Sequence, residues 1–134
     1  MAAITDIEGI GVQIKNKLAK ANIRSVQGLL KEGGTKKGRQ SIAEATGIDE
    51  KKLLDLVNMA DLFRIKGVSS QYAELLKASG VDTIKELRTR KAENLQQKMK
   101  ETNEQKKLTR IVPSVAMITK FIEGAKELNP MVTH

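Results

Sequence analysis

The side chains that most often perform catalysis or bind metal ions are scarce in this sequence. It has no cysteine and one histidine, His134, which is the last residue. A terminal imidazole lacks the fixed geometry that general-base or nucleophilic catalysis requires. No group of candidate ligands has the spacing of a metal site. We therefore expect a protein that is not an enzyme and has no catalytic residue, no metal site and no cofactor.

Backbone groups offer a different chemistry, at a glycine-containing turn that occurs twice. The first copy is Ile7-Glu8-Gly9-Ile10-Gly11-Val12-Gln13, and the second, 58 residues later, is Ile65-Lys66-Gly67-Val68-Ser69-Ser70-Gln71. Glycines on both sides of an apolar residue allow a sharp bend and a close approach to another molecule. A helix that opens directly after the turn would present unpaired backbone N–H groups, which favour an anion such as phosphate.

The repeat continues beyond the two turns. When the two halves are aligned at the same offset of 58 residues, apolar residues of the first half align with apolar residues of the second: Leu18 with Leu76, Ile23 with Val81, Val26 with Ile84 and Leu29 with Leu87. Matched residue classes at a fixed offset indicate an internal duplication. We expect a single unit made of a first half, residues 1–64, and a second half, residues 65–134, which ends in a closing helix.

Apolar residues recur at helical spacing, and no segment alternates long enough to predict a strand, so the predicted fold class is all-α. The resulting fold would be a compact bundle of short helices. Residues 32–35 are predicted to form a loop, residues 108–111 a helical turn, and the last four residues a loose end. The helices themselves are expected over 12–21, around 26–30, through Ile42 to a glycine cap at Gly47, over 49–63, from Tyr72 to Ser79, over 84–87, around Leu95 and Met99, and after Ser114.

The duplicated turn resembles the helix-hairpin-helix motif, in which an apolar-x-Gly-apolar-Gly hairpin precedes an amphipathic helix and a Gly-apolar turn. The first copy has both hairpin glycines but carries Asn22-Ile23 at the second turn. The second copy has Ser69 in place of the second hairpin glycine and keeps Gly80-Val81. The duplication at constant offset makes this short motif more specific.

The chain as a whole resembles a bacterial family of uncharacterised function that is built from tandem helix-hairpin-helix units. The likeness covers nearly the whole chain and rests on Ala60-Asp61-Leu62-x-Arg64-Ile65, Tyr72-Ala73, Val81-Asp82-Thr83 and Pro113-Ser114. It implies two fused repeats in one bundle, without an established activity.

In DNA-binding members of the motif, hairpin N–H groups and nearby Lys or Arg side chains hold phosphates. The resemblance therefore implies weak, sequence-independent binding to double-stranded DNA, because phosphate contacts position a protein without reading bases. The alternative is a scaffold or protein-interaction domain whose hairpins are purely structural. The candidate phosphate-binding residues are Gly9, Gly11, Val12, Gln13 and Lys15 in the first copy, and Gly67, Ser69, Ser70 and Gln71 in the second. We expect the first hairpin to be the stronger site, with Gly11 in a backbone geometry that a side chain would penalise.

The charge of the chain favours a nucleic-acid partner without establishing one. The net charge is +8. Residues 15–39 hold eight Lys or Arg and one Glu, and residues 85–110 hold nine Lys or Arg and four Glu. Such runs are often only solvated helix faces, but two of them on a duplicated framework favour a binding surface. With no membrane-length apolar run and no signal-like N-terminus, we expect a cytoplasmic protein that binds neither membrane nor small-molecule substrate.

Three further patterns suggest activities that we do not assign. Residues 28–35 approximate a phosphate-binding loop, but Gly34 stands where the lysine belongs and no strand precedes it. Lys66 lies near a hairpin, as the nucleophile of helix-hairpin-helix glycosylases does, but a single lysine is more often a surface charge. The three aromatic residues, Phe63, Tyr72 and Phe121, fall on apolar stripes, so we expect no stacking platform for single strands.

The absence of a flexible linker predicts that the two halves unfold together. The helix predicted over 49–63 runs directly into the second hairpin. A truncated chain that ends at Arg64 would expose the stripe of Leu53, Leu56, Val57 and Ala60. We expect it to aggregate or lose helicity in circular dichroism and light scattering. A monomeric, cooperatively folded first half would instead show two independent domains.

Overall fold

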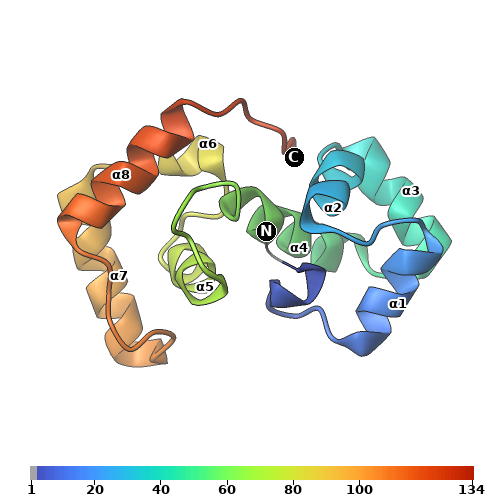
Figure 1. Cartoon of the computed structure of the whole chain (residues 1–134), viewed down its shortest axis with the longest axis horizontal. Helices are drawn as coiled ribbons and strands as arrows, with labels where there is room; N and C mark the ends of the chain where they lie inside the picture. Colours follow the sequence, from blue (N-terminus) through green and yellow to red (C-terminus); the bar gives the residue numbers. More distant parts are fainter. Residues whose placement is uncertain (1–2) are drawn as a thin grey trace. The chain divides into compact units, whose positions relative to one another are not determined.

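The computed structural model describes residues 3–134 and is all-α, as predicted (Figure 1). The described residues form eight α-helices and one 3-10 helix, with no strand among them. The elements are η1 (Ile4–Asp6), α1 (Val12–Lys20), α2 (Val26–Gly33), α3 (Lys36–Thr46), α4 (Glu50–Leu62), α5 (Ser70–Ala78), α6 (Ile84–Leu87), α7 (Ala92–Lys106) and α8 (Val115–Lys126).

The chain divides into two compact units, each with four principal helices. The first unit extends to Asp61 and also contains Met131–His134, and the second is Leu62–Pro130. Each unit has a nine-residue hairpin helix, α1 or α5, followed by a shorter helix, α2 or α6, and then by two longer helices. That the two halves unfold together stays a prediction.

Several helices begin after a residue whose side chain caps them. Ser25, Thr83 and Ser114 each accept a hydrogen bond from the backbone N–H three residues later, at 2.9, 3.2 and 3.2 Å. Such caps satisfy N–H groups that have no partner inside the helix. Gly47 ends α3 in the left-handed conformation, with φ at +76°, which confirms the predicted glycine cap.

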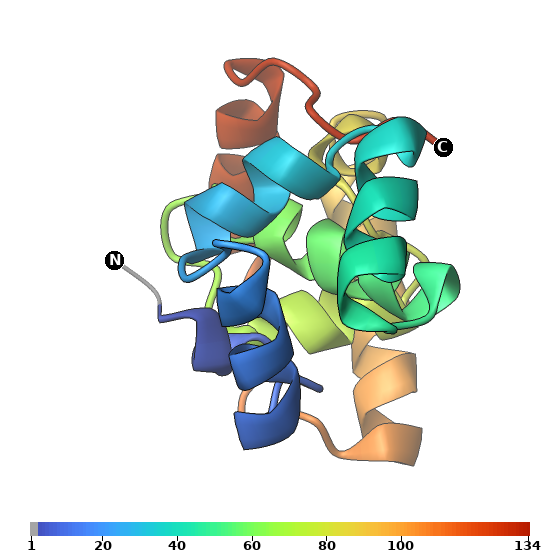
Figure 2. The same ribbon diagram turned by 90° about the vertical axis from the view of Figure 1, so that its right-hand side faces the viewer.

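In the first unit, α2 and α3 pack together and α1 contacts α3; Figure 2 shows these blue-to-cyan helices from their own side. Gly33 lies at the end of α2, and a Cβ there would come within 2.7 Å of Val57 Cγ2 on α4. The predicted loop at 32–35 is therefore too long, because α2 continues through the packed Gly33 and only residues 34 and 35 lie outside a helix. The buried apolar side chains include Leu18, Ile23, Leu29, Leu30, Ile42, Leu53, Leu56 and Val57.

The last four residues pack onto the first unit, so the prediction that they are loose is wrong. The Thr133 N–H donates to the Gly34 carbonyl at 2.8 Å, and Val132 is only 7% exposed. A Cβ on Gly34 would lie 2.4 Å from the carbonyl oxygen of Met131, so glycine permits this approach. The contact comes from residues nearly a hundred positions apart, which no local pattern predicts.

Arg39 joins this C-terminal segment to the end of α2. Its side chain is 4% exposed, and Nη1 donates to the carbonyls of Gly33 and Gly34 at 2.9 and 3.0 Å. Nη2 donates to the Thr133 carbonyl. Burial lowers the pKa of the guanidinium, and the charge of Glu50 acts in the opposite direction. Arginine stays protonated at ordinary pH, so Arg39 is a permanent buried cation rather than part of a binding surface.

In the second unit, α8 packs against α6 and α7, and α5 packs against α7. The predicted helical turn at 108–111 is wrong, because residues 107–114 contain no helix. The Asn103 side chain holds this segment instead: Nδ2 donates to the Thr109 carbonyl and Oδ1 accepts from the Thr109 N–H, both at 3.0 Å. The buried side chains include Leu75, Leu76, Ile84, Leu87, Leu95, Met99, Ile118 and Phe121.

Arg39 and the C-terminal segment should stabilise the first unit as a pair. Arg39→Met leaves three carbonyls without their donor, and hydrogen bonds to a charged group contribute about 1.5–3 kcal/mol each when one partner is lost. A chain ending at Pro130 loses the Val132 contact, worth about 1.5–3 kcal/mol for a fully buried side chain. We expect each change to lower the free energy of unfolding by at least about 2 kcal/mol, measured by urea denaturation.

The two changes combined should cost less than their sum, because the guanidinium and the segment share the Thr133 carbonyl. Strictly additive losses would show that Arg39 and the segment stabilise the unit independently.

Candidate phosphate-binding site

The two hairpins have the same backbone conformation. Gly9 and Gly67 have φ of +95° and +91°, a region that L side chains rarely adopt. The N–H of the apolar residue after each glycine donates a hydrogen bond to the carbonyl of the isoleucine three residues earlier. The distances are 3.1 Å from Ile10 to Ile7 and 3.2 Å from Val68 to Ile65. These flanking apolar side chains are buried in both hairpins. Each turn is therefore fixed by one glycine and by two buried side chains around it.

The second position of each hairpin differs in residue but not in conformation. Gly11 has φ −90° and ψ −170°, and Ser69 has φ −87° and ψ 175°. Any L residue adopts this extended conformation, so the expectation that Gly11 needs a penalised geometry is wrong. The glycine that the backbone requires in the first hairpin is Gly9.

The two hairpin helices differ in how their first N–H groups are satisfied. The Ser69 hydroxyl accepts a hydrogen bond from the Tyr72 N–H at 3.4 Å and so caps α5. Gly11 has no side chain, and no side chain of the described residues caps α1. A Cβ on Gly11 would meet nothing within 4 Å, so this helix start is open to an approaching group. The N-terminus of α1 is therefore the more accessible of the two helix starts.

A lysine from a distant helix lies at the first hairpin. A Cβ on Gly9 would come within 2.6 Å of Lys52 Nζ, so the α4 ammonium group sits beside this turn. At the equivalent turn in the second unit, the neighbour of Gly67 is the Phe121 ring, 3.3 Å from such a Cβ. The left-handed glycine thus adjoins an ammonium group in the first hairpin and an aromatic ring in the second. Sequence reasoning missed Lys52, because nothing local relates it to Gly9.

The turns that close the hairpin helices also match. Asn22 has φ +65° and Gly80 has φ +96°, and the following N–H, of Ile23 or Val81, returns to the carbonyl of Leu18 or Leu76 at 2.9 or 2.8 Å. Asparagine tolerates the left-handed conformation better than most L residues do. The substitution of Asn22 for the usual glycine therefore leaves the turn unchanged.

The structure places the predicted phosphate-binding residues in two separate groups, one in each unit. Gly9, Gly11, Val12, Gln13 and Lys15 are exposed around the start of α1, as are Gly67, Ser69 and Gln71 at the start of α5. Ser70 is half-buried. Within each group, the residues share one hairpin and one helix start.

The Lys and Arg residues of these two charged segments are largely exposed, with three exceptions. In residues 15–39 every Lys and Arg except Arg39 is exposed. In residues 85–110, Arg88 and Arg90 are half-buried, and Arg90 pairs with Glu86 at 3.1 Å and donates to the Gly80 carbonyl at 3.1 Å. Arg39 and Arg90 therefore stabilise turns or helix ends, and the exposed cations supply the surface charge.

Other kinds of site are not apparent in the part of the chain that the structure describes. No three His, Cys, Asp or Glu residues within 3–134 gather as they would around a metal ion. No helix over the same residues combines the length and apolarity that crossing a bilayer requires.

Residues 8–128 match the sequence family described as Domain of unknown function (DUF4332), and the chain therefore belongs to that family. No curated protein and no solved structure matches the chain. The family match confirms the predicted resemblance to a family of uncharacterised function. The helix-hairpin-helix nature of its repeats stays a prediction.

Substitution of the two glycines in the first hairpin should separate their roles. Gly9→Ala forces an L side chain to a positive φ, which costs about 1–2 kcal/mol. Gly11→Ala meets ordinary dihedrals and open space, so we expect a change below about 0.5 kcal/mol. Urea denaturation followed by circular dichroism measures both. A comparable loss in Gly11→Ala would mean that this position constrains the fold.

Proposed function

We propose that this member of the DUF4332 family is a non-enzymatic module that binds double-stranded DNA weakly and without sequence preference. In this proposal, its repeats are helix-hairpin-helix units, and phosphates are held by hairpin N–H groups and by nearby lysines. The first hairpin is the principal site.

The observation that supports this proposal best is the uncapped start of α1 beside a lysine. The first N–H groups of a helix have no partner within the helix and carry partial positive charge from the helix dipole. The space above Gly11 is open, and Lys52 Nζ lies at the adjoining Gly9. A phosphate group could accept hydrogen bonds from these N–H groups and pair with the nearby ammonium group.

The nature of these donors supports binding without sequence preference. Backbone N–H groups and a lysine contact phosphates, which carry no direct sequence information. The exposed Lys and Arg residues of 15–37 add charge on the same unit. Release of counterions by such contacts makes binding sensitive to salt. The alternative, an interaction domain with structural hairpins, requires none of these groups to be accessible.

Titration with duplex DNA at two salt concentrations tests the proposal. Non-specific phosphate contacts typically give dissociation constants of about 10⁻⁴–10⁻⁶ M at physiological salt. We expect a value in this range, a steep loss of affinity as salt rises, and equal binding to scrambled duplexes. Absence of binding at low salt would overturn the proposal and favour the interaction domain.

Gly11→Ser and Ser69→Gly form a matched pair for this titration. The new serine should cap α1 as Ser69 caps α5, and should occupy the space that a phosphate would enter. Loss of one hydrogen bond of about 1 kcal/mol corresponds to about fivefold weaker binding. Ser69→Gly should not weaken binding. Stability should change by only about a few tenths of a kcal/mol in either variant.

Lys52→Gln tests the cation at Gly9, and Lys51→Gln on the same helix is its control. Removal of one phosphate contact should weaken binding to all duplexes and lower the salt slope by about one. Lys51→Gln should leave the slope closer to that of the unaltered chain. If Gly11→Ser binds as well as the unaltered chain while Ser69→Gly binds more weakly, the second hairpin is the principal site.

A further inference from the structure

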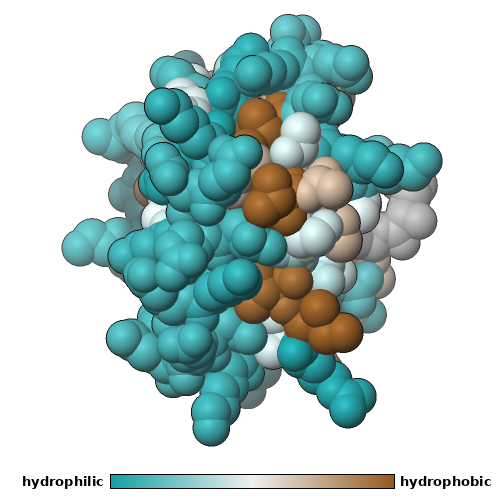
Figure 3. All heavy atoms as spheres, turned by 90° about the vertical axis from the view of Figure 1, so that its left-hand side faces the viewer, coloured by the Kyte–Doolittle hydropathy of each residue, from teal (hydrophilic) through white to brown (hydrophobic). Residues whose placement is uncertain are grey.

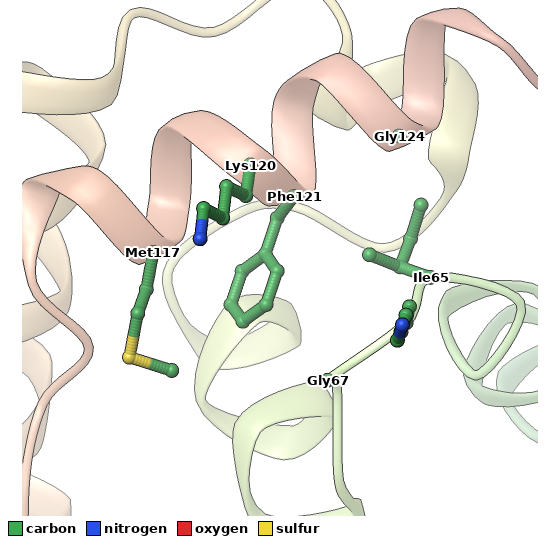
Figure 4. A pocket seen from close by; sticks show the side chains of 7 residues that line it. Ile65, Gly67, Met117, Lys120, Phe121 and Gly124 are labelled. Atoms are coloured by element: carbon green, nitrogen blue, oxygen red, sulfur yellow. The ribbon is translucent and has the colours of Figure 1, made fainter.

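A second kind of site lies beside the second hairpin. A pocket of about 390 Å³ opens between this hairpin and α8, within the second unit (Figure 4). Its volume falls in the range of small-ligand and side-chain pockets, which is about 300–1,000 Å³. Phe121 and Met117 point into it from α8, and Ile65 faces it from the hairpin (Figure 4). On the side where α7 and α8 lie, Figure 3 shows apolar surface exposed among hydrophilic side chains.

The walls of the pocket combine a rigid part and an adaptable part. Phe121 is 3% exposed, and its ring is held by Tyr72 of α5, with centroids 6.4 Å apart at a tilt of 53°. Met117 is 37% exposed at the rim. A methionine side chain bends easily and contacts apolar and aromatic groups well. The pocket can therefore receive a large apolar group without rearrangement of its floor.

Gly124 keeps the pocket open. It lies inside α8, where glycine costs about 1 kcal/mol relative to alanine. An added Cβ would lie 3.9 Å from Ile65 Cδ1, an ordinary contact distance, so packing does not require a glycine there. The backbone of Gly124 is not among those with positive φ. Its effect in this structure is to leave space in the pocket wall.

The charges at the pocket define its partner. Among the residues that the structure describes, the ionisable ones that line it are Lys66 on the hairpin and Lys120 on α8, both exposed. Apolar walls with two ammonium groups complement an apolar group that has carboxylates beside it. DNA would satisfy the lysines but would leave the apolar walls without a partner, because its phosphates and base edges are polar.

We propose that this pocket binds a large apolar side chain from an acidic segment of another protein. The apolar side chain enters between Phe121, Met117 and Ile65, and carboxylates on either side of it pair with Lys66 and Lys120. The proposal does not depend on DNA binding, because the residues that carry it lie in the other unit from Lys52 and Gly11.

Titration of the full chain with a fluorescein-labelled peptide tests this site. The probe carries one phenylalanine flanked by glutamates, and two control peptides replace the phenylalanine by alanine or the glutamates by lysines. We expect the probe alone to bind by anisotropy and to shift the methyl resonance of Met117. Comparable binding of either control peptide would overturn the proposal. A shift of the Met117 resonance that appears on raising the protein concentration without peptide would also overturn the proposal. The pocket would then be occupied by a second copy of this chain.

Variants of the pocket complete the test. Gly124→Leu fills the pocket and should weaken peptide binding at least about tenfold, because the apolar anchor is lost. Lys120→Glu should weaken it about threefold to tenfold, whereas Lys126→Glu, also exposed on α8 but outside the pocket, should have little effect. If Gly124→Leu does not fold, Lys66→Glu combined with Lys120→Glu alters only exposed residues. Unchanged binding in that pair would overturn the proposal, and Gly11→Ser should leave peptide binding unaltered.

Discussion

The left-handed glycine between two buried apolar side chains determines the local structure of each hairpin. At Gly9 and Gly67 the chain must reverse while the residues on both sides stay in the core, and only a positive φ achieves this within so few residues. The reversal also sets where the next helix begins. In both units the helix begins three residues after this glycine, at Val12 in α1 and at Ser70 in α5. Structure and any anion binding therefore arise from one backbone conformation.

The two hairpins share one backbone conformation, and the residues next to that backbone differ between the two units. The turn in the first unit adjoins the Lys52 ammonium group, and the turn in the second adjoins the Phe121 ring. In the first, the helix start is left uncapped, and in the second, the Ser69 hydroxyl occupies that role. A duplicated framework can keep its backbone while its side chains diverge, because the turn requires only the glycine and the buried residues. The two hairpins thus share one backbone conformation and differ in the side chains around it.

Sequence alone predicted the parts of this fold that depend on neighbouring residues. Helical spacing identified the helices, and the glycine cap at Gly47 was predicted because it depends only on the residues at the end of α3. The errors arose where a side chain bonds outside the helical pattern, either to a distant segment or within a loop. The sequence gives no sign that Arg39 differs from the surface cations around it, because its burial depends on a hydrogen bond to the distant C-terminal segment. The apolar spacing after α7 predicts a helical turn, but the hydrogen bonds between Asn103 and Thr109 hold this segment as a loop.

The candidate site shows the same limit. The hairpin residues could be named from the repeat, but Lys52 could not, because its position at Gly9 depends on how α4 packs in the first unit. The role of Gly11 was also misjudged, since a glycine in a motif can provide either a special dihedral angle or empty space. Its angles are ordinary and its surroundings are empty, so space is what it provides. A single hydroxyl group at this position, present in one repeat and absent in the other, decides whether an N–H in the first turn of the helix has a side-chain partner.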